Sequence, residues 1–103
     1  MNKCYFLGRL KERPRLQKIN DTNVTRFNLE VEEFRKDKSG TRKKRKDVLT
    51  FEAWDTAATA INKQALPYDN MVVECVARND RPSDDIVFRV TSFRIFKTFE
   101  DEK

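Results

Sequence analysis

The chain alternates most clearly between apolar and polar residues from Val24 to Phe34. Phe27, Leu29 and Val31 occupy every second position there, and polar residues stand between them. Successive side chains of a strand point to opposite faces, so this pattern predicts a half-buried strand with its apolar residues turned toward a core.

A second alternating segment runs from Val48 to Trp54. The residues expected on its inner face are Leu49, Phe51 and Ala53. This register places Trp54 on the outer face, together with Thr50 and Glu52.

Weaker patterns complete the order of elements. Pro14 and its charged neighbours are expected to end the first strand, Asp55 to cap a short helix, and Pro67 to stop that helix. The last strand is expected to be bulged, because its alternation slips near Ser92. The remaining predicted elements are a strand over Lys3 to Leu10, a helix over Asp55 to about Ala65, and strands over Met71 to Ala77 and Ile86 to Phe96.

Five strands with one helix between the third and the fourth predict an all-β fold, a five-stranded OB-type barrel. In such barrels the second and third strands and the connecting loops bind oligonucleotides. A length of 103 residues fits one domain, which we place at residues 1–99. Residues 100–103 are expected to be a short, disordered acidic end.

The positive charge is concentrated in one segment, which with Ser39 and Gly40 is expected to form a long hairpin loop between the two alternating strands. The net charge is +5, and eight of the twelve residues from Arg35 to Lys46 are Lys or Arg, with Asp37 the only acid. No amphipathic helix lies nearby, so the segment favours a nucleic-acid partner over a membrane surface. The alternative is a hairpin tip that charge merely keeps solvated.

Several chemistries are disfavoured by the composition. The chain has no His and only two distant cysteines, Cys4 and Cys75, so we expect no zinc cluster, other cofactor or imidazole catalysis. The acid pairs Glu32-Glu33 and Asp84-Asp85 make a poor metal site, because adjacent strand residues point apart and adjacent acids in a turn are usually solvated. No leader or run of 18 apolar residues is evident, and we expect a cytoplasmic protein without enzymatic activity.

Three separated segments agree in order and spacing with one known family. They are NKCYFLGRL at residues 2–10 with Pro14 and Leu16, TNVTRFNLEV at residues 22–31, and FEAW at residues 51–54 with Thr56, Ala57 and Ile61. Together they resemble the bacterial single-stranded DNA-binding (SSB) proteins over most of residues 2–77. The resemblance implies an OB fold, homo-oligomers paired partly through the first strand, and DNA held by aromatic stacking and basic side chains.

The resemblance also assigns individual residues. Trp54 matches the family's stacking aromatic at the end of its third strand, and Phe34 lies one residue from a second aromatic position. Lys3 and Arg78 match basic positions on the first strand and after the fourth. The family's long linker and acidic, Phe-ended tail are missing, which fits a short plasmid or phage member or a PriB-like primosomal relative.

The sequence thus predicts sequence-tolerant binding of single-stranded DNA, with RNA left open, in replication, recombination or repair. Apolar residues on both faces of the first strand predict a homodimer or homotetramer, and replication proteins are further candidate partners. The alternative is a PriB-like protein-interaction module of a replication-restart complex that binds nucleic acid weakly. The predicted nucleic-acid-binding residues are Trp54, Phe34, Lys3, Arg35, Arg42, Lys43, Lys44, Arg45, Lys46 and Arg78.

Two questions stay open at this point. Trp54 could be a stacking platform, an oligomer contact, or a core residue after a register slip. The predicted binding face also carries Glu30, Glu32 and Glu52, which would repel phosphates.

Overall fold

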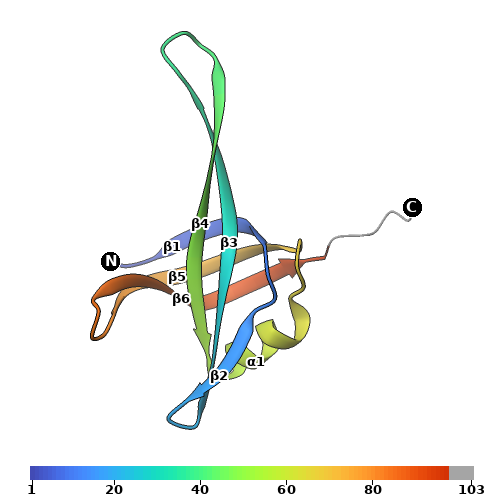
Figure 1. The fold of residues 1–103 in the computed structure, drawn as a ribbon, viewed down its shortest axis with the longest axis vertical. Helices are drawn as coiled ribbons and strands as arrows, with labels where there is room; N and C mark the ends of the chain where they lie inside the picture. The colour runs from blue at the N-terminus through green and yellow to red at the C-terminus, as the bar shows by residue number, and fades with distance from the viewer. Residues whose placement is uncertain (98–103) are drawn as a thin grey trace.

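The computed structural model describes residues 1–97, which form six strands and one helix (Figure 1). The predicted acidic end at residues 100–103 lies outside the described residues. In chain order the elements are β1 (Cys4–Leu10), β2 (Arg15–Ile19), β3 (Thr22–Lys36), β4 (Arg42–Trp54), α1 (Asp55–Gln64), β5 (Asn70–Asp80) and β6 (Asp85–Phe96).

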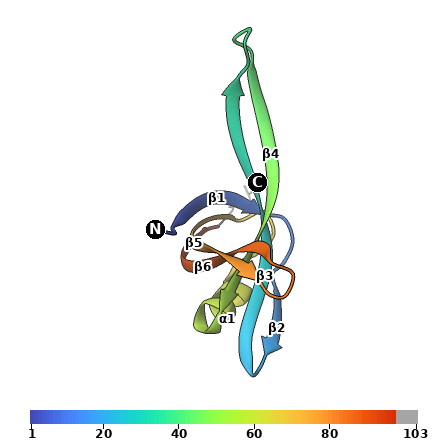
Figure 2. The same cartoon turned by 90° about the vertical axis from the view of Figure 1, so that its left-hand side faces the viewer.

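The strands close into a barrel. β1 pairs with β5, β5 with β6, β6 with β4, β4 with β3, and β3 again with β1, and all these pairs are antiparallel except β4 with β6. The helix α1 stands between β4 and β5 in the chain and lies at one end of the barrel (Figures 1 and 2). The predicted all-β, five-stranded barrel is confirmed.

The first strand of the barrel is broken in two. Leu10 of β1 lies opposite Leu29 of β3, and Arg15 of β2 lies opposite Arg26 further along the same edge of β3. β2 therefore continues β1 after an interruption that contains Pro14. The sequence analysis missed β2, because the sequence RLQKI has no apolar alternation and most of its residues are exposed.

The core forms around Phe51, which has no exposed surface. The ring of Phe27 stacks on it at 5.6 Å between centroids, and Phe6 and Phe88 pack at 5.4 and 5.7 Å. The helix adds the buried side chain of Ile61 to this cluster. The inward positions predicted for both alternating strands are confirmed: Phe27, Leu29, Phe51 and Ala53 are buried, and Val31 and Leu49 pack against them.

β1 passes very close to β3 at Gly8. A Cβ atom on Gly8 would lie 2.8 Å from Cβ of Leu29 and 2.9 Å from the carbonyl oxygen of Glu30. Real Cβ atoms are essentially never that close to other heavy atoms, so this approach requires glycine.

The helix and the last strand test two smaller predictions. Among residues 1–97, no side chain caps α1 by a hydrogen bond. Trp54 holds the cap position, and Asp55 lies within the helix at a φ of 59°. The prediction that Asp55 caps the helix is therefore wrong. The bulge in β6 is confirmed, because Glu74 faces Ser92 whereas Cys75 faces Val90, which leaves Thr91 as the extra residue.

β3 and β4 extend far beyond the barrel as a two-stranded ribbon (Figures 1 and 2). Their pairing continues to Lys36 opposite Arg42. The turn is closed by the Asp37 carboxylate, which accepts hydrogen bonds from the backbone N–H groups of Ser39 and Thr41 at 3.0 and 2.9 Å. The basic segment was predicted to be a loop connection. This is wrong for most of it, since all of its cations except Lys38 stand on paired strands.

Candidate nucleic-acid interface

Trp54 is the last residue of β4 and lies on the outer face of the barrel, as predicted. Its neighbours in the strand fix this orientation, because Phe51 and Ala53 point inward and are fully buried. The Trp54 side chain itself is only half-buried. A core position after a register slip is therefore excluded, and a role on the surface of the barrel remains.

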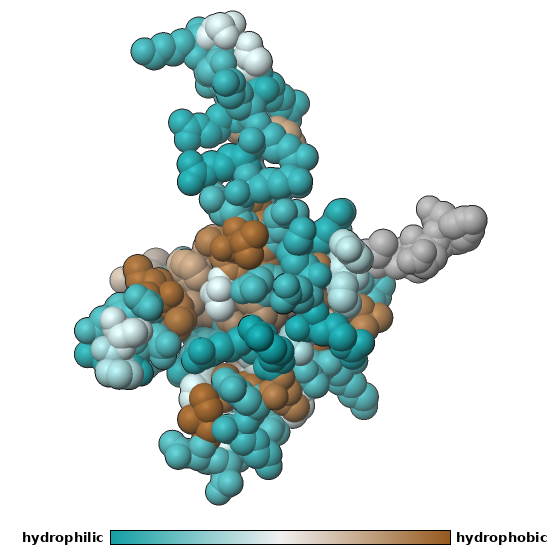
Figure 3. Space-filling model, viewed as in Figure 1, coloured by the Kyte–Doolittle hydropathy of each residue, from teal (hydrophilic) through white to brown (hydrophobic). Residues whose placement is uncertain are grey.

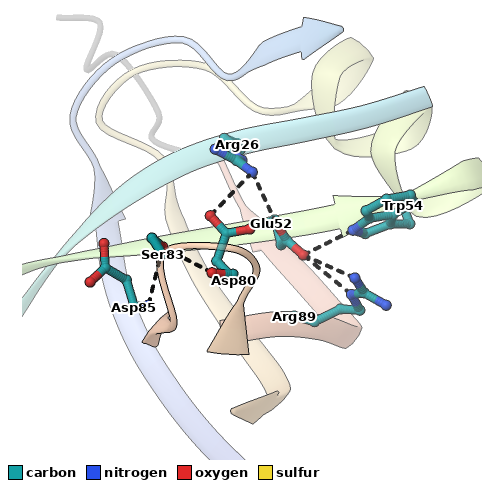
Figure 4. Close-up of polar contacts among 7 residues, drawn as sticks. All are labelled: Arg26, Glu52, Trp54, Asp80, Ser83, Asp85 and Arg89. Atoms are coloured by element: carbon teal, nitrogen blue, oxygen red, sulfur yellow. Dashed lines mark hydrogen bonds and ion pairs between the residues drawn. The ribbon is translucent and has the colours of Figure 1, made fainter. Parts of the chain in front are cut away.

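Trp54 contacts two charged side chains, Glu52 from its own strand β4 and Arg89 from β6 (Figure 4). The indole Nε1–H of Trp54 donates a hydrogen bond of 2.9 Å to Oε1 of Glu52. The same oxygen accepts from Nε and Nη2 of Arg89, on β6, at 3.3 and 3.2 Å. The guanidinium carbon of Arg89 also lies 4.6 Å from the centre of the Trp54 ring, which is cation–π geometry.

A second arginine approaches Glu52 from the opposite side. Nη2 of Arg26 on β3 lies 3.6 Å from Oε2 of Glu52 and 3.9 Å from Oδ2 of Asp80 (Figure 4). Arg15 of β2 is the register partner of Arg26, and the two help to line an open surface hollow of about 540 Å³. Arginine side chains thus follow one another across β2, β3 and β6 on the Trp54 side of the barrel.

Phe34 lies on the β3–β4 hairpin, toward the end away from Trp54. Phe34 is 53% exposed and lies opposite Lys44. The guanidinium carbon of Arg42 lies 4.4 Å from the centre of its ring. Ten ladder positions separate it from the Val24–Trp54 pair, which is roughly 33 Å at 3.3 Å per residue. The two predicted aromatics are therefore not neighbours; they stand far apart along one ribbon.

We call the projecting part of the hairpin, residues 32–47, the basic ribbon. Four of its predicted cations form ion pairs: Lys44 and Lys46 with Glu32 at 3.6 and 3.9 Å, Lys43 with Asp37 at 3.9 Å, and Arg45 with Asp47 at 3.2 Å. Within residues 1–97, Arg35 and Arg42 form no ion pair. The ribbon surface is mainly hydrophilic in Figure 3, and such exposed pairs contribute little stability.

The acids on this face are all paired with cations. Glu30 lies 3.7 Å from Lys11, Glu32 contacts two lysines, and Glu52 is held between Arg26 and Arg89. The repulsion expected from these three carboxylates is therefore largely offset by neighbouring charge.

Lys3 and Arg78 lie apart from the other predicted residues. Nζ of Lys3 is 3.5 Å from Glu74, whose carboxylate raises the pKa of this exposed amine. Arg78 is exposed on β5 and helps to line a hollow together with Asn2. Within the described residues, no hydrogen bond, ion pair or ring contact joins either side chain to Trp54 or to the basic ribbon.

Sequence reasoning missed Arg26 and Arg89. Arg26 was detectable, because it alternates outward with Asn28 on a strand whose faces were correctly predicted. Arg89 was not, since its face depends on the exact place of the bulge at Thr91. The polar partners of Glu52 come from separate strands and leave no local pattern.

Two further kinds of feature are absent from residues 1–97. No helix among residues 1–97 is long and apolar enough to cross a membrane. The same residues contain no group of three or more His, Cys, Asp or Glu side chains that could hold a metal ion.

Several solved structures have a fold similar to that of this chain. The single-stranded DNA-binding protein of Thermus aquaticus, in a deletion mutant, superposes with a TM-score of 0.82 at 13% identity. The alignment covers 94% of this chain, which spans only about half (51%) of the Thermus protein. The Plasmodium falciparum SSB in complex with ssDNA gives 0.76 at 19% identity, with 93% of each chain covered.

A small single-stranded DNA-binding protein from Streptomyces coelicolor gives a TM-score of 0.67 at 16% identity, covering 91% of this chain and 93% of the other. These likenesses confirm the OB-type fold. No curated protein matches the sequence significantly. The family described as the single-strand binding protein family, however, matches residues 1–98. The resemblance found in the sequence is thereby confirmed, and the chain belongs to the single-strand binding protein family.

Proposed function

We propose that this protein binds single-stranded DNA with little sequence preference, along the outer face of β3 and β4. The observation that carries the proposal is the continuity of this face. It has a tryptophan at one end and an exposed phenylalanine at the other, each in contact with an arginine, and its three carboxylates are all paired with cations. The Plasmodium family member was solved with ssDNA, which supports the same ligand class.

Two kinds of contact would hold the strand. Trp54 and Phe34 offer π faces to bases, and base–aromatic stacking contributes about 1–3 kcal/mol per base without selecting a sequence. The arginines and lysines offer a track for phosphates, from Arg26 and Arg89 to the basic ribbon. In the basic ribbon, the ion pairs of the lysines and Arg45 with exposed acids are weak enough for phosphates to replace the carboxylates.

We further propose that the protein acts as a homodimer or homotetramer. Within residues 1–97, the edge of β1 from Cys4 to Gly8 has no strand partner on the side away from β5. Beside that edge Tyr5 and Leu7 are 63% and 60% exposed. Unpaired edges and exposed apolar side chains favour association with another copy. A dimeric or tetrameric mass by light scattering at tens of micromolar would support this, and a monomeric mass would contradict it.

The cellular role that fits is replication, recombination or repair, in which single strands are exposed. A second candidate is a PriB-like interaction module of a replication-restart complex. One observation favours it: four of the predicted DNA-binding cations are already paired with acids of the ribbon. Pairing of this kind would weaken the attraction to phosphates.

A titration distinguishes the two candidates. Labelled oligothymidine is followed by fluorescence anisotropy at 20 and 200 mM salt, with oligouridine in parallel to compare RNA. The DNA-binding proposal expects saturable binding that weakens steeply with salt. Absence of binding at the lower salt concentration would instead select the interaction module.

A further inference from the structure

Glu52 is a buried carboxylate on the face to which we assign DNA. Its residue is only 4% exposed, although its position in β4 points away from the barrel core. Arg26 on β3 and Arg89 on β6 are its register partners on the two sides. A buried acid on a surface that must attract phosphates requires a physical reason, because it opposes the ligand's charge.

The contacts of Glu52 suggest that reason. A single oxygen, Oε1, accepts from the Trp54 indole and from the Arg89 guanidinium, and this guanidinium stacks on the Trp54 ring. The three side chains restrain one another, so these contacts limit the rotamers of both the indole and the guanidinium. The other oxygen of Glu52, Oε2, forms an ion pair with Arg26 at 3.6 Å.

We propose that Glu52 is a positioning residue for the bound strand: it fixes the Trp54 indole and the Arg89 guanidinium in the orientation that receives a base and its phosphate. The inference rests on the proposed function. Side chains ordered before binding do not have to be ordered by the ligand, and affinity rises accordingly. The negative charge itself costs little, because two arginines flank it.

This account and simple electrostatics predict opposite signs. If Glu52 were only an unfavourable charge, Glu52→Gln would bind DNA more tightly. If Glu52 positions the ring, Glu52→Gln should bind oligothymidine about three- to tenfold more weakly, because the ionic contacts with both arginines are lost. Glu52→Asp keeps the charge but withdraws it by one methylene, so it should also weaken binding.

The experiment is a double-mutant cycle. Oligothymidine affinity is measured for the parent, Glu52→Gln, Trp54→Ala and the double variant, with folding checked by circular dichroism. The matched control is Glu30→Gln, which removes a carboxylate from the same face without touching Trp54. Because Glu52 acts partly through Trp54, Glu52→Gln should cost clearly less affinity once Trp54 is gone, so the two losses should not add. The effect that remains in the double variant is the one exerted through Arg89.

A second readout needs no DNA. Trp54 is the only tryptophan, so its fluorescence anisotropy decay reports the mobility of one ring. Fast depolarisation should increase in free Glu52→Gln and not in Glu30→Gln. Unchanged mobility, additive losses, or parental or tighter binding by Glu52→Gln would overturn the proposal.

The two failures can be told apart. If Trp54→Ala weakens binding but Glu52→Gln does not, the positioning role alone is wrong. If the parent binds no oligothymidine, the proposed function itself is wrong.

Discussion

The guanidinium carbon of Arg42 lies 4.4 Å from the centre of the Phe34 ring, on the part of the hairpin that projects beyond the barrel. Arg42 stands two residues from Lys44, the register partner of Phe34, so the contact is a diagonal cross-strand pair. Such a pair at an exposed site contributes only about 0.5–1 kcal/mol. Phe34 is half-exposed and lies outside the core, so its ring is available to contact a ligand.

Replacing Phe34 with Ala should therefore weaken oligothymidine binding by about 1–3 kcal/mol, the value of one stacked base. The free energy of unfolding should fall by less than about 1 kcal/mol, since only the cation–π contact is lost. Anisotropy titration and urea unfolding measure the two effects. A variant with parental affinity would remove Phe34 from the site.

The basic ribbon should contribute mainly through salt-dependent contacts. Changing Lys43, Lys44 and Arg45 together to Ala should lower affinity and reduce the slope of log K against log salt by up to roughly 2, at about 0.7 per phosphate contact. Stability should change by no more than about 0.5 kcal/mol for each surface substitution.

Lys63→Ala, in the last turn of α1, is the control for the loss of charge alone. It should leave the salt slope unchanged. If the triple variant also keeps the parental affinity and slope, the ribbon is only a solubilising hairpin.

Gly8→Ala should destabilise the barrel by about 1–3 kcal/mol, because its Cβ would meet Leu29 and the Glu30 carbonyl oxygen at less than 3 Å. Gly40→Ala is the comparison: it has open space around its Cβ position but a φ of +85°. It should lose only about 1 kcal/mol from backbone strain. Thermal or urea unfolding ranks the two, and a harmless Gly8→Ala would contradict the close approach of β1 and β3.

The Cys75 thiol should be unreactive in the folded protein. Burial, with smaller effects of Cys4 and Glu74, raises its pKa to about 12. At pH 8 roughly one molecule in ten thousand would then carry the thiolate, which is the form that reacts. Mass spectrometry after iodoacetamide should find Cys75 unmodified at pH 8 and modified in guanidinium. Rapid native labelling would contradict its burial.

The alternation of apolar residues was enough to predict the barrel, its inner faces and the outward position of Trp54. Alternation needs apolar residues, however, and the segment from Arg35 to Lys46 has none. Its strands are held mainly by backbone pairing, and cross-strand charge pairs such as Lys46 with Glu32 add little. The sequence therefore predicted a loop where the structure has a ribbon.

The site was only partly predictable for a related reason. Phe34 and Trp54 could be recognised singly, but the distance between them follows from the length of the ribbon. Arg26, Glu52 and Arg89 meet because β3, β4 and β6 are neighbours in the sheet, and residues 26, 52 and 89 show no relation along the chain.

The central claim is that a single strand stacks on Trp54, and the intrinsic fluorescence of this residue tests it most directly. Titration with oligothymidine at low salt should quench the emission in a saturable way, and added salt should reverse the quenching. Trp54→Ala should bind about 1–3 kcal/mol more weakly while keeping its fold. Tight binding of oligothymidine with unchanged Trp54 emission would contradict the account.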